Sequence, residues 1–166
     1  MTGHAIALRT FEEKLARYSD PAETGAALHA LTEAVIGVRL FTLTAINLAA
    51  GHVRRVYTSH ANVYPLLGTK PIVLDDWFVS MQTERRITAI NTAAEMEGNF
   101  GDLDLIRTLG CNASISIPVM AGNDLLGTIN ALDAEGRYTA DVVERAADLI
   151  VPALAVFLIL RQHFEL

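Results

Sequence analysis

The clearest strand pattern lies in the second half of the chain. Residues 114–120 and 125–132 are apolar runs on either side of a turn in which Gly122 and Asn123 can adopt positive φ angles. This arrangement predicts a β-hairpin. Within its second strand, Gly127 suits a place where another backbone or a helix approaches closely.

A second hairpin is predicted over residues 41–48 and 53–59, which are joined at Ala50-Gly51. Side chains alternate between the two faces of a strand, so the register decides which residues lie together. A two-residue turn would place one face, with Phe41, Leu43, Ala45 and Val56, against helices. The other face would then carry hydroxyl groups, from Thr42, Thr44, Tyr57 and Ser59.

Helical patterns occupy both ends of the chain. Residues 6–18 predict a short amphipathic helix. The next helix begins at Asp20, a good N-cap that is followed by Pro21, and it ends at Gly37. Thr139 caps a last helix over residues 140–163.

The middle of the chain is less regular. Asp75 can cap a helix over residues 76–83, and residues 87–90 form a short strand. A short helix is predicted over 103–109. Residues 60–71 are rich in turn-forming residues and predict a loop, whereas 91–101 show little periodicity.

These elements predict one α+β domain over residues 1–166. Its antiparallel sheet would have about five strands, with the long terminal helices on one face. Loops and short helices would cover the other face and leave a pocket beneath them. Residues 1–19 would be an N-terminal helical extension, and 139–164 would form the C-terminal helix.

Two stretches of sequence resemble a known family. Residues 109–133, LGCNASISIPVMAGNDLLGTINALD, resemble the C-terminal half of a GAF domain. Residues 55–71, RVYTSHANVYPLLGTKP, resemble a segment of small, free-standing bacterial GAF proteins. The resemblance extends from about residue 22 to 160. It implies a GAF-like, profilin-like fold and a sensory or regulatory domain that binds a small molecule.

Composition narrows the classes of function. Hydrophobic residues make up 51% of the chain, which excludes a disordered protein. The net charge of −6 argues against nucleic acid as a partner, since phosphate binding needs clustered Lys and Arg. The apolar run 149–160 is shorter than the roughly 20 residues that a membrane span requires. Without a signal peptide at the N-terminus, we expect a cytoplasmic protein that has no membrane partner.

The C-terminal helix is apolar on almost every side from residue 149 to 160. A helix of this kind is normally buried all round, and one sheet face cannot cover it completely. The sequence therefore predicts a homodimer formed through this helix, with residues 22–35 beside it.

The sequence offers little for catalysis. Cys111 is the only cysteine, so it cannot form a disulfide within the chain or a thiolate metal cluster. Because no catalytic motif of hydrolases, zinc proteases or nucleotide-binding loops occurs, we expect no catalytic residue, no metal and no cofactor. The main enzymatic alternative follows from the resemblance, because some GAF proteins are free methionine sulfoxide reductases. They use several cysteines, whereas a sulfenate formed here would have no thiol to resolve it.

The resemblance leaves further ligands open. Cyclic-nucleotide-binding GAF domains carry an Asn-Lys…Phe…Asp-Glu signature, which neither Lys14 nor Lys70 matches. Bilin-binding GAF domains attach the chromophore through a cysteine, often in a Cys-His pair, whereas Cys111 precedes Asn112. Both ligands are disfavoured by these departures.

A non-covalent sensor would use aromatic, hydroxyl and amide side chains. The candidate ligand-binding residues are Thr44, Tyr57, Ser59, Tyr64, Trp77, Ser114 and Asn130. Ser114 and Asn130 share a face only if a bulge interrupts the second hairpin. Because Lys70, Asp75 and Asp76 are expected to face water, the ligand should be mostly uncharged. A purely structural dimerisation module with a filled pocket is the alternative to a sensor.

Overall fold

A computed structural model of the protein describes residues 3–66 and 68–163. Long helices lie at both ends of the chain, and short helices lie between some of the strands in its middle. The helical elements are α1 (Gly3–Leu15), α2 (Pro21–Ile36), α3 (Asp76–Glu84), α4 (Ala93–Met96), α5 (Leu103–Thr108), α6 (Ala140–Ala146), the 3-10 helix η1 (Ala147–Leu149) and α7 (Ile150–His163). The strands are β1 (Leu40–Asn47), β2 (His52–Thr58), β3 (Lys70–Pro71), β4 (Thr88–Ile90), β5 (Ala113–Ala121) and β6 (Asp124–Asp133).

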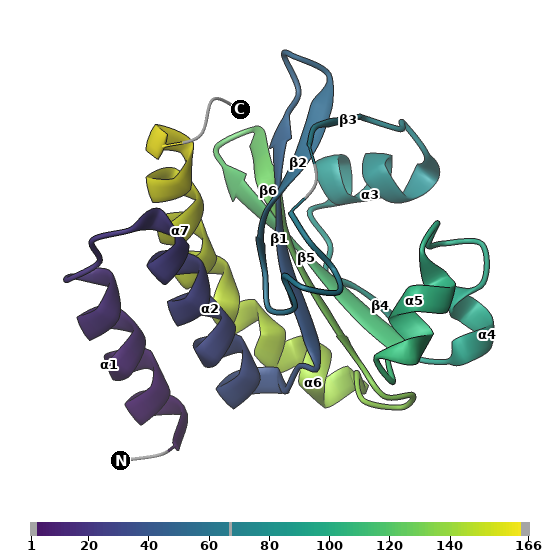
Figure 1. Ribbon diagram of the computed structural model, residues 1–166, viewed down its shortest axis with the longest axis horizontal. Coiled ribbons are helices and arrows are strands. Elements are labelled where there is room, and N and C mark those ends of the chain that lie inside the picture. Colours follow the sequence, from purple (N-terminus) through teal and green to yellow (C-terminus); the bar gives the residue numbers. More distant parts are fainter. Residues whose placement is uncertain (1–2, 67, 164–166) are drawn as a thin grey trace.

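One antiparallel sheet runs through the centre of the molecule, in the order β3-β2-β1-β6-β5-β4. Helices α2, α6 and α7 cover one face, and α1 packs on the outer side of α2 (Figure 1). Helices α3, α4 and α5 lie over the opposite face, which we call the covered face (Figure 1). The predicted α+β class and the two differently covered faces are confirmed.

The sheet has six strands within the described residues, one more than expected. The additional strand is β3, which lies in the segment that was predicted to be a loop. It is only two residues long, and Lys70 pairs with Val53 at the edge of the sheet. A strand of two residues shows no alternation of apolar and polar side chains in the sequence, so only its pairing with β2 identifies it.

The helical face holds the main hydrophobic core. Phe41, Ile115, Ile129 and Phe157 are fully or almost fully buried there. Gly127 allows α7 to approach the sheet, since a side chain at this position would collide with the Phe157 ring and with the Thr44 carbonyl oxygen. The close approach expected at this glycine is therefore present.

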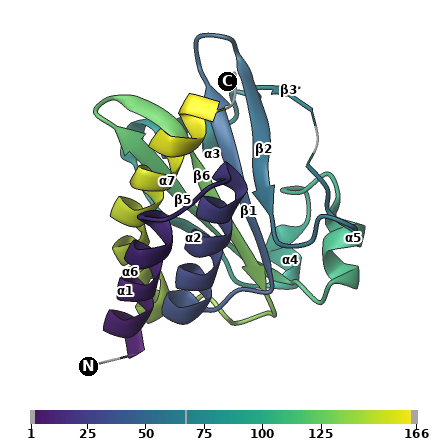
Figure 2. The same ribbon diagram turned by 60° about the vertical axis from the view of Figure 1, so that its left-hand side comes forward.

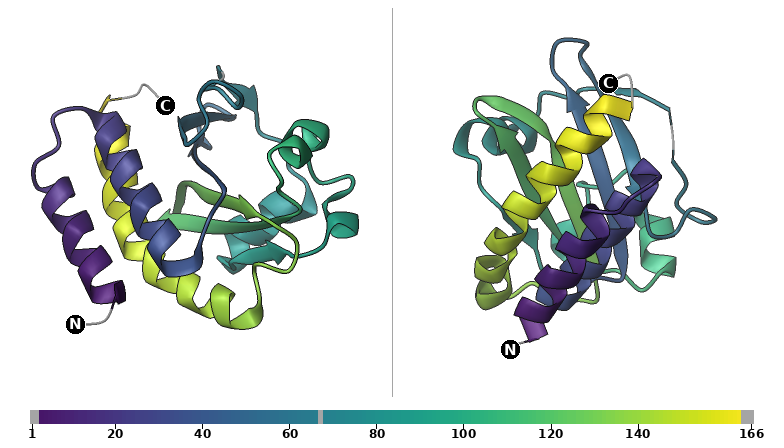
Figure 3. Two further views of the ribbon diagram at one scale, coloured as in Figure 1. Left: turned by 60° about the horizontal axis from the view of Figure 1, so that its bottom comes forward. Right: turned by 90° about the vertical axis from the view of Figure 1, so that its left-hand side faces the viewer.

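The C-terminal helix is divided, contrary to the single helix expected. Helix α6 passes through η1 into α7, and Pro152 lies in the first turn of α7. Proline has no backbone N–H and its ring crowds the carbonyl group four residues earlier, so the tighter 3-10 turn falls just upstream. Figure 3 shows this helical stretch crossing the sheet beside α2.

The β1–β2 hairpin has a different register from the predicted one. Asn47 pairs with His52, so a longer loop replaces the two-residue turn, and a bulge follows between Leu43 and Thr44. Consequently Thr44 pairs with Arg55 and not with Tyr57. A one-residue slip moves a side chain to the other face. The prediction that Tyr57 shares a face with Thr42 and Thr44 is wrong.

The β5–β6 hairpin contains the bulge on which the site prediction depends. The register shifts between Val119 and Met120, so that Ser116 pairs with Asn130 and Ser114 with Leu132. Without this shift, Ser114 and Asn130 would point to opposite faces. Both now belong to the covered face.

Candidate ligand-binding site

The centre of the covered face is polar. Three adjacent strands contribute Thr42, Thr44, Ser114, Ser116, Thr128 and Asn130, which we call the polar band. A sheet covered on both faces normally carries apolar side chains on both. The polar band is therefore the first sign of a site.

Asn130 connects the members of the polar band. Its Nδ2 donates to Thr44 Oγ1 over 3.3 Å and to Thr128 Oγ1 over 3.1 Å. Its Oδ1 accepts a hydrogen bond from Ser116 Oγ at 3.1 Å. The Thr44 oxygen acts as an acceptor here, which leaves its own hydroxyl proton able to bind another group.

Apolar clusters close both ends of the polar band. At one end, Leu40 and Leu132 of the sheet pack with Met96, Ile106 and Tyr64 from the chain between β2 and β5, which we call the covering segment. At the other end, Ile46 and Leu125 pack with Phe78 of α3. The covering segment is thus attached at two places, and the polar band lies between them.

A cavity of about 470 Å³ lies over the polar band. This volume is in the range of small-molecule sites. Its floor includes Ser114, Ser116 and Asn130, and Phe100 and Trp77 form part of its walls. Trp77 is 42% exposed, so its ring stands at the mouth of the cavity.

Two further hollows adjoin this cavity at Lys70. The first has a volume of about 110 Å³ and is lined by Thr44, Val53, Arg55, Gly68 and Lys70. The second has a volume of about 490 Å³, and its walls include Arg55, Tyr64, Lys70 and Asp102. Lys70 is common to all three spaces. Figure 2 shows β3 beside β2 at the edge of the sheet.

The structure brings together only part of the predicted site. Ser114, Trp77 and Asn130 line the 470 Å³ cavity, and Thr44 lines the adjoining 110 Å³ hollow. Tyr64 lies in the wall of the 490 Å³ hollow. These five residues therefore lie in the predicted region, on or beside the covered face.

Tyr57 and Ser59 do not line the described cavities of the covered face. The Tyr57 ring packs edge-on against Phe41, with 5.8 Å between ring centroids, and lies against Gly25 of α2. Ser59 accepts a hydrogen bond from the Phe41 backbone N–H at 2.9 Å and lies 2.8 Å from His60 Nδ1. Tyr57 is half-buried and packs against the main core, whereas Ser59 binds the backbone at the end of the hairpin.

Several cavity residues were not predicted. Ser116 could have been found, since it lies two positions after Ser114 and therefore shares its face. Lys70 and Asp75 also line the cavity, and both are exposed at the ends of elements, as expected. No local pattern marks Lys70, because its place depends on the long-range pairing of β3 with β2.

Tyr64 is held by two charged neighbours. The Arg55 guanidinium lies 3.7 Å above the centre of its ring, and Arg55 Nη1 donates to the Pro65 carbonyl oxygen over 2.7 Å. Burial and hydrogen bonding to Asp102 raise the pKa of the Tyr64 phenol above its ordinary value. Tyr64 therefore remains neutral near pH 7, and Arg55 is fixed in position.

Cys111 lies outside the lining of the cavity. It is fully buried, and its thiol donates a long hydrogen bond of 3.9 Å to the Leu109 carbonyl oxygen. Burial raises the pKa of the Cys111 thiol to about 11. A thiol needs to be ionised and accessible to act as a nucleophile, and Cys111 is neither near pH 7.

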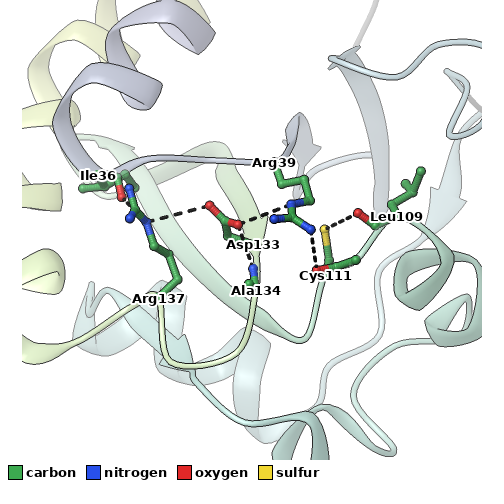
Figure 4. A network of polar contacts seen from close by, with 8 residues as sticks. Ile36, Arg39, Leu109, Cys111, Asp133, Ala134 and Arg137 are labelled. Atoms are coloured by element: carbon green, nitrogen blue, oxygen red, sulfur yellow. Dashed lines mark hydrogen bonds and ion pairs between the residues drawn. The ribbon is translucent and has the colours of Figure 1, made fainter.

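Next to Cys111, two arginines share one carboxylate (Figure 4). Arg39 Nε lies 3.5 Å from Asp133 Oδ1, and Arg137 Nε lies 3.8 Å from Asp133 Oδ2. Arg39 also donates to the Gly110 carbonyl oxygen, while Arg137 donates to that of Ile36 at the end of α2. These contacts connect four chain segments, which gives the network a structural role.

Another hollow, of about 520 Å³, lies between α1 and α2. Its walls are charged and exposed, with Glu13, Lys14, Arg17 and Glu23 around a floor of alanines. It lies on the outer side of the helical layer and contains no part of the polar band. We therefore place the candidate site on the covered face, where buried polar groups and a concave space coincide.

Within residues 3–66 and 68–163, no group of three or more His, Cys, Asp or Glu side chains could hold a metal ion. In the same part of the chain, no helix is long and apolar enough to cross a bilayer.

The architecture is similar to that of solved GAF domains. It matches the GAF domain of an Acinetobacter phosphoenolpyruvate-protein phosphotransferase over 98% of this chain and 97% of that one, with a TM-score of 0.73 and 10% identity. The GAF domain of a Coxiella burnetii phosphoenolpyruvate-protein phosphotransferase matches over 97% and 95%, with a TM-score of 0.71 and 12% identity. The phycoerythrobilin-bound GAF domain of a cyanobacterial phytochrome matches over 99% and 100%, with a TM-score of 0.65 and 16% identity.

No protein-family model and no curated protein matches the sequence. At such low identities, the agreement with solved structures establishes the architecture and not the ligand. The resemblance seen in residues 55–71 and 109–133 is confirmed at the level of the fold. The chain has the fold of a GAF domain.

Proposed function

We propose that this protein is a non-catalytic sensory or regulatory domain that binds a small organic molecule over the polar band. The observation that carries the proposal is the 470 Å³ cavity above Ser114, Ser116 and Asn130. The hydroxyl groups of the polar band keep donor or acceptor capacity beyond their bonds to Asn130, and a ligand in this cavity would use it. Trp77 and Phe100 would contact its planar or apolar part.

The burial of Cys111 supports a non-catalytic role. A methionine sulfoxide reductase would need a reactive thiol at the ligand, whereas this thiol is buried in an apolar cluster away from the cavity lining. Its raised pKa further disfavours the thiolate form. A dimerisation module with a filled pocket remains the second candidate, and the open cavity argues against it.

We also propose that the protein acts as a homodimer or through a partner protein. On α7, Val151 is 74% exposed and Leu158 is 46% exposed, and Leu154 lies between them at helical spacing. These residues form an apolar stripe on the outer side of the helical layer. Burial of this stripe against a second copy would remove it from water. A localisation in the cytoplasm is part of the same proposal.

A ligand screen tests the sensor function. Native mass spectrometry of freshly purified protein would reveal a retained molecule, and a metabolite library would be tested for an increase in melting temperature and a shift in Trp77 fluorescence. Trp77 is the only tryptophan, so the fluorescence reports on the cavity mouth alone. Trp77→Ala and Asn130→Ala should weaken the thermal stabilisation by a ligand.

Tyr57→Phe serves as the matched control, because Tyr57 lies on the helical face and should leave binding unchanged. The sensor function is wrong if no compound of any charge binds and an experimental structure shows the cavity filled by side chains. In that case the dimerisation module becomes the better description.

A further inference from the structure

The small hollow beside the cavity has a lining that favours negative charge. Its five lining residues include two cations, Arg55 and Lys70, and the hydroxyl group of Thr44, but no acid. Arg55 and Lys70 come from the paired strands β2 and β3. Lys70 lies opposite Val53, and Arg55 is two residues further along β2, so the three side chains share the covered face.

Neither cation is paired with an acid among residues 3–66 and 68–163. Arg55 is held by neutral groups, namely the Tyr64 ring and the Pro65 carbonyl oxygen. Its guanidinium is thereby positioned while part of its donor capacity stays free.

The nearby acids are occupied by other partners. Asp75 caps α3 and accepts from the Phe78 backbone N–H at 2.8 Å. Asp102 is hydrogen-bonded to Tyr64 and lies in the wall of the 490 Å³ hollow. Neither acid lines the small hollow, so an incoming anion there would meet only donors and the apolar Val53 and Gly68.

Thr44 joins the hollow to the main cavity. Its oxygen accepts from Asn130 Nδ2, so its proton can be donated to an anion in the hollow. Lys70 lines both spaces. A single molecule can therefore place an anionic group beside Thr44, Arg55 and Lys70 while its body extends over the polar band toward Trp77.

We infer that the ligand is a small organic oxyanion, whose carboxylate or phosphate group binds in the hollow between β1, β2 and β3. This inference rests on the proposed sensor function and departs from the mostly uncharged ligand that the sequence suggested. The hollow of about 110 Å³ admits one such group and no larger body. Charge-assisted hydrogen bonds from Arg55 and Lys70 would dominate its recognition.

The test compares molecules that share a body and differ in charge. Phenylacetate and indole-3-acetate are titrated by calorimetry against their primary amides, and phenyl phosphate and inorganic phosphate form a second arm. At low ionic strength, we expect either the carboxylates or the phosphates to bind about tenfold more tightly than the neutral amides. This preference should shrink as salt is added.

Variants assign the preference to the hollow. Lys70→Gln should remove most of the difference between anion and amide, whereas Lys14→Gln should leave it intact. Lys14 is the only other lysine and lies on α1, on the far side of the helical layer. Arg55→Gln should have the same effect as Lys70→Gln. Arg55→Lys keeps the charge but loses the contact with the Tyr64 ring. If its melting temperature is unchanged, this variant should retain part of the preference for anions.

Each outcome has a distinct meaning. Lys70-dependent binding in either arm supports the inference and assigns the group as carboxylate or phosphate. Equal binding of acids and amides, binding that ignores Lys70→Gln, or no binding of any anion overturns it. A neutral metabolite that binds through Asn130 would overturn the oxyanion inference alone, whereas the absence of any ligand would overturn the sensor function itself.

Discussion

Asn130 and Thr44 lie on neighbouring strands, and the 3.3 Å hydrogen bond between them joins positions that are 86 residues apart in the chain. Through this contact, the two hairpins share one polar surface. The same amide group also binds Ser116 and Thr128, so three hydroxyl groups depend on a single side chain.

Replacement of Asn130 by alanine should therefore be costly even without a ligand. Because three partly buried hydroxyl groups lose their partner, we expect Asn130→Ala to lower the free energy of unfolding by about 2 kcal/mol. Urea denaturation measures this change. Asn62→Ala, in an exposed turn, should change stability by less than about 0.5 kcal/mol. Equal effects of both substitutions would show that the amide network contributes little.

Gly127 should tolerate no side chain. A methyl group there would collide with Phe157 and with the Thr44 carbonyl oxygen, so α7 would have to move away from the sheet. We expect Gly127→Ala to lower the free energy of unfolding by about 2 kcal/mol or more. At Gly101, an added methyl group meets open space, and Gly101→Ala is the matched control for the same denaturation experiment.

The apolar stripe on α7 should hold two copies together. Analytical ultracentrifugation at micromolar concentration is expected to give about twice the chain mass of 18.0 kDa. Replacing both Leu154 and Leu158 with glutamate should yield a monomer, because buried carboxylates would lose their hydration. Leu74→Glu changes an exposed leucine of the covering segment and should leave the dimer intact. A monomeric parent protein would contradict the proposal.

Stability should depend on His29 in mildly acidic solution. Burial lowers the pKa of His29, which stacks on Phe41 with 5.0 Å between ring centroids. The unfolded chain therefore binds a proton more readily than the folded one, so stability is highest above the ordinary pKa of 6.5 and falls as pH decreases below it. His29→Gln should flatten the slope of unfolding free energy between pH 7 and 5.5, roughly the range in which an unperturbed histidine titrates.

Cys111 should behave as a packing residue. Because burial raises the pKa of its thiol to about 11, alkylation by iodoacetamide at pH 7 should be far slower than in the unfolded chain. Between the ordinary pKa of 9.0 and about 11, the folded chain retains a proton that the unfolded chain loses, so this group destabilises the fold as pH rises. Cys111→Ala should keep ligand binding. Thiol-dependent reduction of methionine sulfoxide that disappears in this variant would instead reveal an enzyme.

The two hairpins explain which parts of the site could be predicted. In the β5–β6 hairpin, the apolar pattern and the Gly-Asn turn predict both strands. Only the bulge, which decides whether Ser114 and Asn130 lie on the same face, was left open. In the β1–β2 hairpin, Leu48, Ala49 and Ala50 can continue a strand or form a loop. The loop forms, and together with the bulge it moves Tyr57 onto the helical face. Local sequence could not decide this, because burial of Tyr57 against Gly25 is a long-range contact.

The charged side of the site was beyond local pattern altogether. Lys70 reaches the cavity through β3, a strand that exists only by pairing with β2. In the sequence, Arg55 is one of two adjacent arginines with no other basic residue nearby. Only the structure shows that its guanidinium lies over the Tyr64 ring. Composition and periodicity describe elements, whereas the polarity of a pocket depends on which elements meet.

The two separate attachments of the covering segment have a consequence for how the cavity can be entered. Around α4 and α5, the buried cluster includes Leu40, Met96, Ile106 and Leu132, whereas the cluster that holds α3 has a smaller buried core. Local opening requires less free energy where fewer apolar contacts are lost. Helix α3, which carries Trp77, would thus detach while α4 and α5 remain in place, and a molecule could enter or leave without melting of the sheet below.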